Sequence, residues 1–368
     1  MRPMTVLQLL PDLNVGGVER GTLEIANALV KGGHRAIVIS NYGRMVEELL
    51  ASGAEHIAMP VGKKSLTTLR YIKALRTIIQ DEKVDIVHAR SRLPAWIGWR
   101  AIKGIKISPP HWLTTVHGPY SVNRYSRIML SGERVIAISE FIRRYITHNY
   151  PDVDANKIKL IHRGVDAGIY NQQFVAGKNW LAEFQQQPYY SPDKKILIFP
   201  GRLTRWKGQA DFIHLMSRLR QAKHAVVGLV VGAQSDNKSN FEAELKNEVS
   251  RLGLTDSVFF LGNRQDLREL FSVADLSFSL PNVPEAFGRT TLEALSLGTP
   301  VIGYDEGGTG EILSHLFPSG LTPKSNPDAL YDKTVQLLNA VPQVRENKEM
   351  TTANMQAATL AVYQSLVN

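Results

Sequence analysis

The hydrophobic pattern of the chain alternates between two kinds of segment. Short apolar runs rich in β-branched residues recur along it, and segments with a helical spacing of apolar residues separate them. This alternation predicts a parallel α/β architecture. The predicted strands of the first half cover residues 5–10, 36–40, 84–88, 113–116, 135–138 and 158–161. Those of the second half cover residues 196–200, 226–231, 258–261, 276–279 and 301–303.

The pattern breaks between the two series of strands. Residues 166–193 are polar and aromatic and have no clear period, which is typical of a linker with one short helix. We therefore expect two doubly wound sheets in tandem rather than one large sheet. The predicted domains are a Rossmann-like domain at 1–173, a linker at 174–193, a second Rossmann-like domain at 194–345, and a terminal helical segment at 346–368 that could pack back on the first domain.

The composition is that of a globular protein. The chain has 368 residues, of which 43% are hydrophobic and 21% are charged, and it has no cysteine. No run approaches the roughly 20 apolar residues that span a bilayer. The first residues are interrupted too early, by Pro11 and Asp12, to form a secretory signal. We therefore expect a cytoplasmic protein without disulfides or thiolate metal sites.

The net charge of +9 is concentrated in the first half. Residues 1–175 contain 24 Lys and Arg against 14 Asp and Glu, whereas the remainder contains 19 against 20. This asymmetry favours an anionic partner for the first half, such as a phosphorylated acceptor, an anionic membrane surface or a nucleic acid. A solvated basic surface is an equally good interpretation of the charge alone.

Two strand-end loops carry candidate phosphate-binding residues. Gly16 and Gly17 follow the first strand, and their bare amides could approach a ligand, although a tight turn explains a glycine pair as well. Arg202 and Lys207 follow the strand at 196–200, where two fixed cations could bind a diphosphate. The alternative is a solvated pair of side chains.

A third loop, PNVPEAFGRTTLEALSLG, follows the strand at 276–279. A helix that starts near Thr290 would leave the amides of Gly288 and Arg289 free to bind an anion. Glu285 and Glu293 flank this helix start, and two carboxylates would repel an anion unless they bind hydroxyl groups on it. A nucleotide sugar has hydroxyl groups on both sides of its diphosphate. The loop therefore indicates a nucleotide-sugar site, whereas a helix-dipole role explains each carboxylate only singly.

These motifs resemble those of a known family. PEAFGRTTLEALSLGTPVIG is similar to the E-x7-E signature of the family-four retaining glycosyltransferases, and NVGGVER, TTVHG, RVIAIS and GRLTRWKG stand in the order and spacing of that family. The wording PEAFGRT is similar to bacterial enzymes of lipopolysaccharide and cell-surface polysaccharide synthesis. The resemblance implies a GT-B fold, in which two tandem Rossmann-like domains, the first for the acceptor and the second for the nucleotide sugar, face each other across a cleft.

The resemblance also implies a role for each matching residue. Glu285 would bind the transferring sugar and His117 would lie beside the reacting centre, although a strand-end histidine can also be a buried structural residue. Glu293 would bind the ribose. The remaining donor-binding residues would be Gly16, Gly17, Arg202, Lys207, Phe287, Gly288 and Arg289 around the diphosphate and sugar, and Asn263, Arg264 and Leu267 around the nucleobase.

Two positions depart from the family pattern. Residues 163–166 read RGVD where the family usually has Asn-Gly-Val-Asp, so the turn into the linker begins with Arg163. Ala286 stands where the family often has glycine. Neither change removes a charged group from the implied site.

The sequence analysis therefore predicts a metal-independent retaining glycosyltransferase without a cofactor. It would move a hexose or N-acetylhexosamine from a nucleotide sugar, with UDP favoured, to an anionic glycolipid, oligosaccharide or lipopolysaccharide-type acceptor. Arg90 and Arg92 are candidate acceptor residues, with a solvated turn as the alternative. Asp152 and Asp154 form a D-x-D that we interpret as a loop or capping pair rather than a metal site.

Several alternatives remain open at this stage. The chain could be a catalytically silent sugar-nucleotide binder, or a GT-B transferase that uses a GDP-sugar and a soluble acceptor. The basic half carries no recognisable nucleic-acid module, so we expect no nucleic-acid partner. Peripheral contact with the inner face of the plasma membrane is possible through this half, where Trp96, Trp99 and Tyr120 accompany the basic residues.

Overall fold

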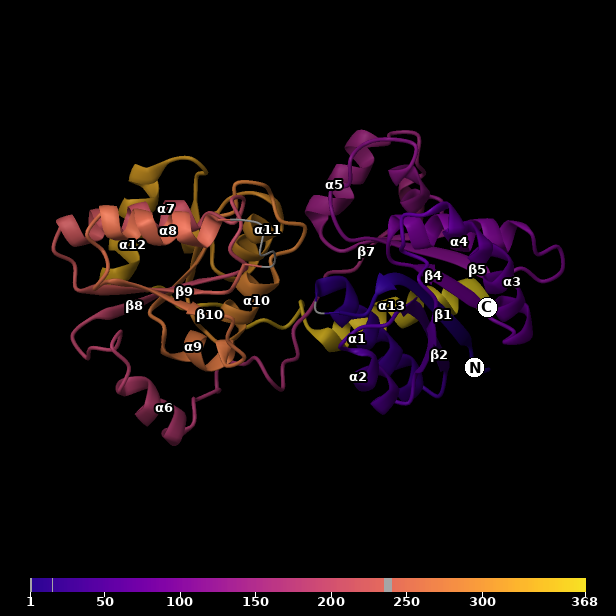
Figure 1. Ribbon diagram of the computed structural model, residues 1–368, viewed down its shortest axis with the longest axis horizontal. Helices are drawn as coiled ribbons and strands as arrows, with labels where there is room; N and C mark the ends of the chain where they lie inside the picture. The colour runs from indigo at the N-terminus through magenta and orange to yellow at the C-terminus, as the bar shows by residue number, and fades with distance from the viewer. Residues whose placement is uncertain (1, 15, 235–239) are drawn as a thin grey trace. The chain divides into compact units, whose positions relative to one another are not determined.

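The chain folds into two compact units (Figure 1). A computed structural model describes residues 2–14, 16–234 and 240–368. The first unit comprises Met1–Arg163 and Thr352–Asn368, and the second comprises Gly164–Thr351. The sequence analysis ended the first domain at residue 173, whereas the compact unit ends ten residues earlier. The second unit also contains the whole predicted linker, in which α6 (Lys178–Gln185) forms.

The first unit is built on a seven-stranded sheet in the order β3-β2-β1-β4-β5-β6-β7. All of the strand pairs in this sheet are parallel. β1 is buried along most of its length because its apolar residues face helices on both sides. The strands are β1 (Thr5–Asp12), β2 (Arg35–Asn41), β3 (Glu55–Ala58), β4 (Ile86–Ala89), β5 (His111–Val116), β6 (Arg134–Ala137) and β7 (Ile158–Leu160).

Helices connect these strands. α1 begins at Gly17 and buries one face that includes Leu23, Ile25 and Leu29. The α-helices of the first unit are α1 (Gly17–Lys31), α2 (Val46–Ala51), α3 (Tyr71–Asp81), α4 (Arg92–Lys103), α5 (Glu140–Asn149) and α13 (Thr352–Val367). Its short 3-10 helices are η1 (Leu66–Arg70), η2 (Ser126–Leu130) and η3 (Ala155–Lys157).

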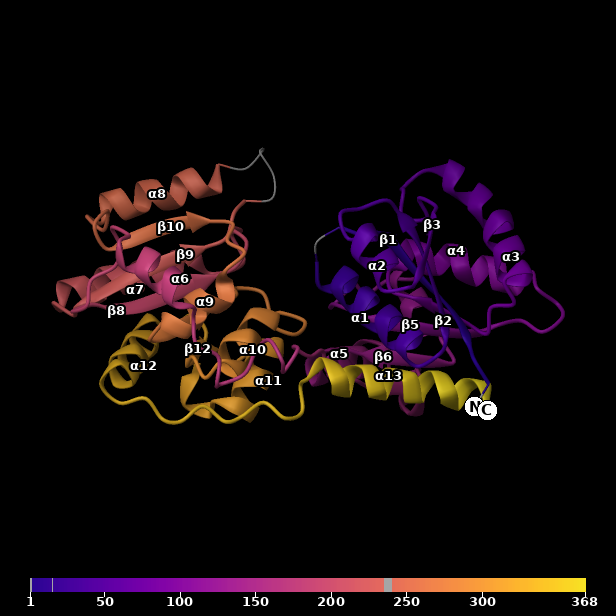
Figure 2. The same cartoon turned by 90° about the horizontal axis from the view of Figure 1, so that it is seen from below.

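The last helix, α13, completes the first unit. Met355 and Tyr363 lie in the same hydrophobic core cluster as residues of α1 and of the central strands. The Tyr363 hydroxyl lies 2.7 Å from Nδ1 of the buried His88, and Gln356 Nε2 donates to the Glu24 carbonyl at 2.8 Å. Figure 2 shows α13, in yellow, alongside the first unit. A segment that is distant in sequence therefore closes one face of the first sheet.

The second unit repeats the architecture with six strands in the order β10-β9-β8-β11-β12-β13. β9 is buried at every position, as its continuous run VVGLVV predicts. The strands are β8 (Lys195–Pro200), β9 (Val226–Val231), β10 (Val258–Gly262), β11 (Leu276–Ser279), β12 (Val301–Tyr304) and β13 (Leu321–Thr322). The helices after α6 are α7 (Gln209–Gln221), α8 (Phe241–Arg251), α9 (Leu267–Val273), α10 (Arg289–Ser296), α11 (Gly307–Leu316), η4 (Pro318–Gly320) and α12 (Pro327–Asn339).

Both sheets have the strand order of doubly wound folds, with strand order reversing once in each. The reversal lies between β1 and β4 in the first sheet and between β8 and β11 in the second. Ligands of open α/β sheets bind at the carboxyl ends of the strands at such a reversal. The prediction of two parallel Rossmann-like sheets is confirmed.

Two short strands escaped the sequence prediction. β3 reads EHIA, and its side chains are partly exposed at the edge of the first sheet. β13 is only two residues long. Both are edge strands without an apolar run, because an edge strand buries less of its surface than a central one. In the part of the chain that the structure describes, no helix has the length and apolar character needed to cross a membrane.

Candidate active site

Arg202 and Lys207 lie in the loop between β8 and α7, at the strand-order reversal of the second sheet. The loop leaves the strand through Gly201, at a φ of 142°, and ends at Gly208, which caps α7 in the left-handed region. Among the described residues, the exposed Arg202 guanidinium has no side-chain partner. The Lys207 side chain is 18% exposed. One free and one partly buried cation thus lie ahead of a helix N-terminus, where anions are stabilised.

The second half of the site is the loop between β11 and α10. Phe287 is 6% exposed, and Gly288 caps α10 at a φ of 94°, a conformation that favours glycine. The helix begins at Arg289, one residue before the predicted start. The amides of its first turn have no intrahelical acceptor, so this helix start can bind an anion as the sequence analysis expected.

The structure joins the two loops directly. Lys207 Nζ forms an ion pair with Glu285 Oε1, and both side chains are largely buried. Gly208 lies against β11, since a Cβ atom on it would stand 1.9 Å from the Leu280 carbonyl oxygen. A lysine predicted for the diphosphate and a glutamate predicted for the sugar therefore contact one another directly.

The start of α11 also supports this site, and the sequence analysis missed it. The Gly308 amide donates to the Glu285 carbonyl at 2.8 Å, and a Cβ atom on Gly308 would stand 2.1 Å from the Phe287 carbonyl oxygen. Thr309 Oγ1 lies 3.2 Å from Ser279 Oγ at the end of β11. The sequence signal was a second glycine pair after a predicted strand, in DEGGTGE.

Glu293 is the most buried carboxylate of the predicted site. It is 8% exposed and lies on the second turn of α10. Arg289 Nε donates to Glu293 Oε1 at 2.9 Å, one helical turn away. This pair orients the carboxylate, whose oxygens are acceptors suited to the hydroxyl groups of a sugar.

The predicted nucleobase residues follow the edge strand β10. Asn263 is exposed, and Leu267 is the first residue of α9. Arg264 forms a bidentate pair with Asp266 at 2.8 and 2.6 Å, and this pair raises the pKa of Arg264 and lowers that of Asp266. Trp180 Nε1 of α6 donates to the same carboxylate at 2.7 Å. The three predicted nucleobase residues thus lie within five positions of the chain, and β9 separates their strand, β10, from β8.

The remaining predicted site residues belong to the first unit. Gly16 and Gly17 stand at the start of α1, as expected. His117 follows β5, and its Nε2 is buried without a hydrogen-bond partner among the described residues. Burial holds the pKa of His117 well below its usual range, and the guanidiniums of Arg163 and Arg90 lower it further. His117 is therefore a neutral imidazole beside two cations.

The interpretation of Arg90 as part of a solvated turn is wrong. Arg90 is 2% exposed, and its Nε donates to Gln8 Oε1 of β1 at 2.7 Å. Arg92, by contrast, packs its guanidinium over the rings of Tyr120 and Tyr125, at 4.8 and 5.5 Å from their centroids. The two arginines thus have different environments although one residue separates them.

The D-x-D residues have structural roles. Asp154 Oδ1 accepts from the Asn156 amide at 2.9 Å and caps η3, which confirms the predicted capping role. Asp152 forms an ion pair with Arg127. Within residues 2–14, 16–234 and 240–368 there is no group of three His, Cys, Asp or Glu residues that could hold a metal ion.

Comparison with protein families assigns both halves of the chain. Residues 15–168 match the model described as Glycosyltransferase Family 4, and residues 182–353 match the model described as Glycosyl transferases group 1. The chain belongs to the GT-B glycosyltransferases of group 1. The two matched regions of this glycosyltransferase correspond to its two compact units.

Solved structures and curated proteins resemble this glycosyltransferase. A glycosyltransferase from Rickettsia africae has a TM-score of 0.87 and 27% identity, with 100% of both chains covered. Anabaena HepE in complex with UDP and glucose has a TM-score of 0.76 and 22% identity over 99% of this chain and 98% of that one, which shows the fold alone.

One curated relative is named for lipopolysaccharide core biosynthesis. The lipopolysaccharide core biosynthesis mannosyltransferase LpsB of Rhizobium meliloti is 28% identical over 48% of this chain and 53% of its own length. The chain spans about half the length of several curated relatives that it matches.

Proposed function

We propose that this glycosyltransferase moves a hexose or N-acetylhexosamine from a UDP-sugar, with retention of configuration, to an anionic glycolipid or lipopolysaccharide-type acceptor. The main support for the proposal is the ion pair between Lys207 and Glu285. It joins the loops that follow β8 and β11, where the strand order of the second sheet reverses. HepE, which has the same fold, was solved with UDP and glucose, and LpsB acts in lipopolysaccharide core synthesis. These two proteins support the choice of donor and acceptor.

The site residues divide the chemistry of transfer between them. The bond from the anomeric carbon to the phosphate oxygen breaks, and negative charge develops on the departing UDP. Arg202, Lys207 and the first amides of α10 stabilise that charge. The acceptor oxygen bonds to the anomeric carbon on the face that the phosphate leaves, and the phosphate takes the acceptor proton. No separate catalytic base is needed, and Glu285 and His117 position the sugar.

A thermal-shift measurement tests the donor assignment. A UDP-sugar at about 100 times its dissociation constant stabilises a protein by about 2.7 kcal/mol, so for a chain of 368 residues we expect the melting temperature to rise by about 3–4 °C. The Arg202→Gln variant should lose most of this shift. The matched control is Arg205→Gln, since Arg205 lies on the same loop but pairs with Glu244 at 2.7 Å.

Other outcomes of this measurement separate the alternatives. A shift with a GDP-sugar and none with a UDP-sugar would exclude the proposed donor. Binding without transfer to any acceptor would favour a catalytically silent sugar-nucleotide binder. We propose that no metal takes part, so transfer should proceed at the same rate in EDTA, and a loss of activity that Mn²⁺ restores would contradict this.

We also propose that the first unit contacts an anionic membrane through a surface around α4, the peripheral contact foreseen from its charge. Trp96 and Trp99 pack edge to face with centroids 5.9 Å apart, and Arg100 lies over both rings. A groove of about 340 Å³ beside them is lined by Trp96, Trp99, Arg124, Arg127, Ile128, Leu130, Ser131 and Val153. Aromatic rings flanked by cations suit the headgroup region of a bilayer.

Vesicle sedimentation tests the membrane contact. Each basic residue near an anionic surface contributes about 1 kcal/mol, so the double variant Arg100→Gln/Lys103→Gln should bind anionic vesicles about 30-fold more weakly than the unmodified protein. Neither the unmodified protein nor this double variant should bind neutral phosphatidylcholine vesicles. The control is Lys31→Gln/Lys178→Gln, which removes two exposed cations elsewhere. Equal losses in both double variants would mean that total charge, not this surface, drives binding.

A further inference from the structure

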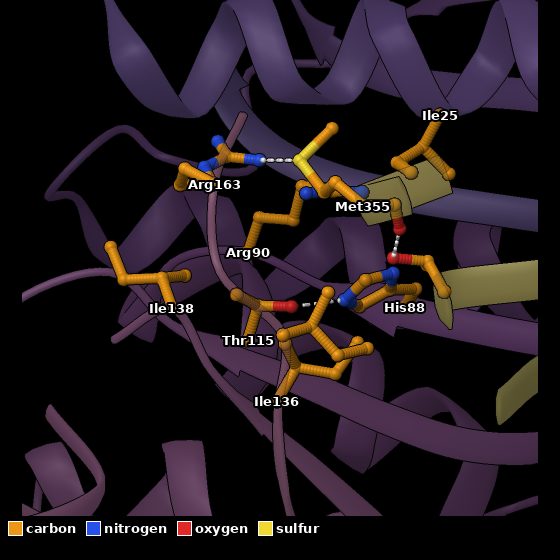
Figure 3. A pocket seen from close by; sticks show the side chains of 10 residues that line it. Ile25, His88, Arg90, Thr115, Ile136, Ile138, Arg163 and Met355 are labelled. Atoms are coloured by element: carbon orange, nitrogen blue, oxygen red, sulfur yellow. Dashed lines mark hydrogen bonds between the residues drawn. The ribbon is translucent and has the colours of Figure 1, made fainter. Parts of the chain in front are cut away.

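A small cavity lined by both apolar and polar side chains lies near the carboxyl ends of β4, β5 and β6 (Figure 3). Its lining includes His88 and Arg90 at the end of β4, Thr115 of β5, Arg163 after β7, and Met355 of α13. Its volume of about 10 Å³ has room for one water-sized group. The cavity thus lies near the edge of the sheet at which open α/β sheets bind ligands, and within the first unit alone.

Arg90 brings an incompletely satisfied charge to this cavity. The residue is 2% exposed, and its Nη2 has no hydrogen-bond partner among the described residues. Burial lowers the pKa of Arg90, whereas Tyr363 and Glu24 oppose the shift. A buried charged group without full hydrogen bonding is costly, so this guanidinium is suited to a further anionic partner.

Arg163 supplies a second cation from another part of the chain. Its guanidinium donates to the Gly17 carbonyl at the start of α1, and Nη1 lies 3.5 Å from the Met355 sulfur. The position depends on Gly21, because a Cβ atom there would stand 1.9 Å from Arg163 Nη1. In Figure 3 the side chains of Arg90 and Arg163 both extend toward Met355.

The side chains that line the cavity carry no negative charge of their own. None of the ten described lining residues is Asp or Glu. His88 is held between the hydroxyls of Tyr363 and Thr115, at 2.7 and 2.6 Å, and burial holds its pKa well below the usual range, so it stays neutral. Glu19 acts on Arg163 and Glu24 on Arg90 through space.

We propose that this cavity receives one oxygen of an anionic group of the acceptor, a phosphate or a carboxylate, between the guanidiniums of Arg90 and Arg163. The remainder of the group would lie at the mouth of the cavity. The inference deepens the proposed function, because it assigns the negative charge of the acceptor to a specific pair of arginines. Arg92, the other candidate, is held against two tyrosine rings and has no part in this subsite.

The test uses the full chain with inorganic phosphate and malonate as probes, each compared with sodium chloride at equal ionic strength. Phosphate could also bind the diphosphate loop, so all proteins carry Arg202→Gln. We expect both probes to raise the melting temperature of this parent protein. Adding Arg163→Gln should weaken the apparent affinity at least about tenfold, since a charge-assisted hydrogen bond is lost.

Two further variants keep the test decisive. Arg134→Gln removes a cation from the opposite edge of the same sheet, where Arg134 donates to the Glu133 carbonyl, and should leave the probe effect unchanged. Arg90→Lys keeps the buried positive charge but removes the Nη2 donor of the guanidinium. It should weaken probe binding as Arg163→Gln does. Stabilisation by the probes no greater than by chloride, or an equal effect in the Arg163→Gln variant, would overturn the proposal.

The donor measurement distinguishes this proposal from the proposed function. The Arg163→Gln variant with Arg202 intact should keep most of its UDP-sugar shift, because Arg202, Lys207 and Glu293 lie in the second unit. If the UDP-sugar shift were absent while the phosphate effect depended on Arg163, the donor assignment would fail and the anion subsite would stand. The reverse result would remove the subsite and leave the donor assignment intact.

Discussion

Replacing Lys207 with methionine or Glu285 with glutamine is expected to lower kcat for sugar transfer by about 10²- to 10³-fold in each case. In the proposed mechanism, Lys207 places a positive charge where the leaving diphosphate develops negative charge, and Glu285 holds the sugar that transfers. Each variant removes one partner of a largely buried ion pair and leaves the other partner unneutralised beside the donor. The measurement is single-turnover transfer at saturating UDP-sugar.

The losses in kcat caused by the two substitutions should not multiply when both are present. Both residues belong to one ion pair in the proposed donor site, so the double variant should lose far less than the product of the two single losses. Lys195→Met is the matched control. Lys195 pairs with Asp275 at 2.8 Å and is the first residue of β8, whereas the Lys207 loop follows the other end of that strand. Normal kcat in either site variant, or an equal loss in the control, would refute the assignment.

Gly208→Ala is expected to damage both stability and donor binding. Gly208 has a φ of 90°, which costs a residue with a side chain about 1–2 kcal/mol, and its added Cβ would collide with the Leu280 carbonyl 1.9 Å away. Overpacking of this kind adds about 1–3 kcal/mol. We therefore expect a total loss of about 2–5 kcal/mol in urea unfolding, together with a weaker UDP-sugar shift.

Gly253→Ala separates the two causes. Gly253 also has a positive φ, of 68°, but a Cβ atom there would meet nothing within 4 Å. This variant should lose only the conformational part, about 1–2 kcal/mol, and should bind the donor normally. Equal destabilisation in the two variants would show that the contact between Gly208 and Leu280 does not hold the loops together.

Most of the fold was accessible from the sequence because central parallel strands are continuous apolar runs. β9 and β11 were predicted with their observed bounds, and the missed strands β3 and β13 are the edge strands that lack such a run. The start of α10 was placed within a residue, because Gly288 and Gly298 mark the two ends of that segment. The domain boundary was set too late, since residues 164–173 are polar but belong to the second unit.

The candidate site was only partly accessible. Family motifs identified Lys207 and Glu285 separately, but nothing in the spacing of 78 residues between them indicates a direct ion pair. The glycines that start α11 were overlooked because their role depends on the contact with Phe287, not on a charged group. Arg163 looked like a local departure at a turn, and its proximity to Arg90 appears only once the strands that carry them are assembled.

The sequence by itself determined the class of this protein. Its apolar runs predict two parallel sheets, and the residue types at the strand ends supply the cations, helix amides and carboxylates of the proposed nucleotide-sugar site. Tertiary structure alone decided which of these groups meet. Pairing β8 with β11 brings Lys207 to Glu285, and packing α13 on the first sheet buries Arg90 in a cavity with Arg163. Burial and contact between distant segments depend on the three-dimensional packing of the whole unit, which no local pattern contains.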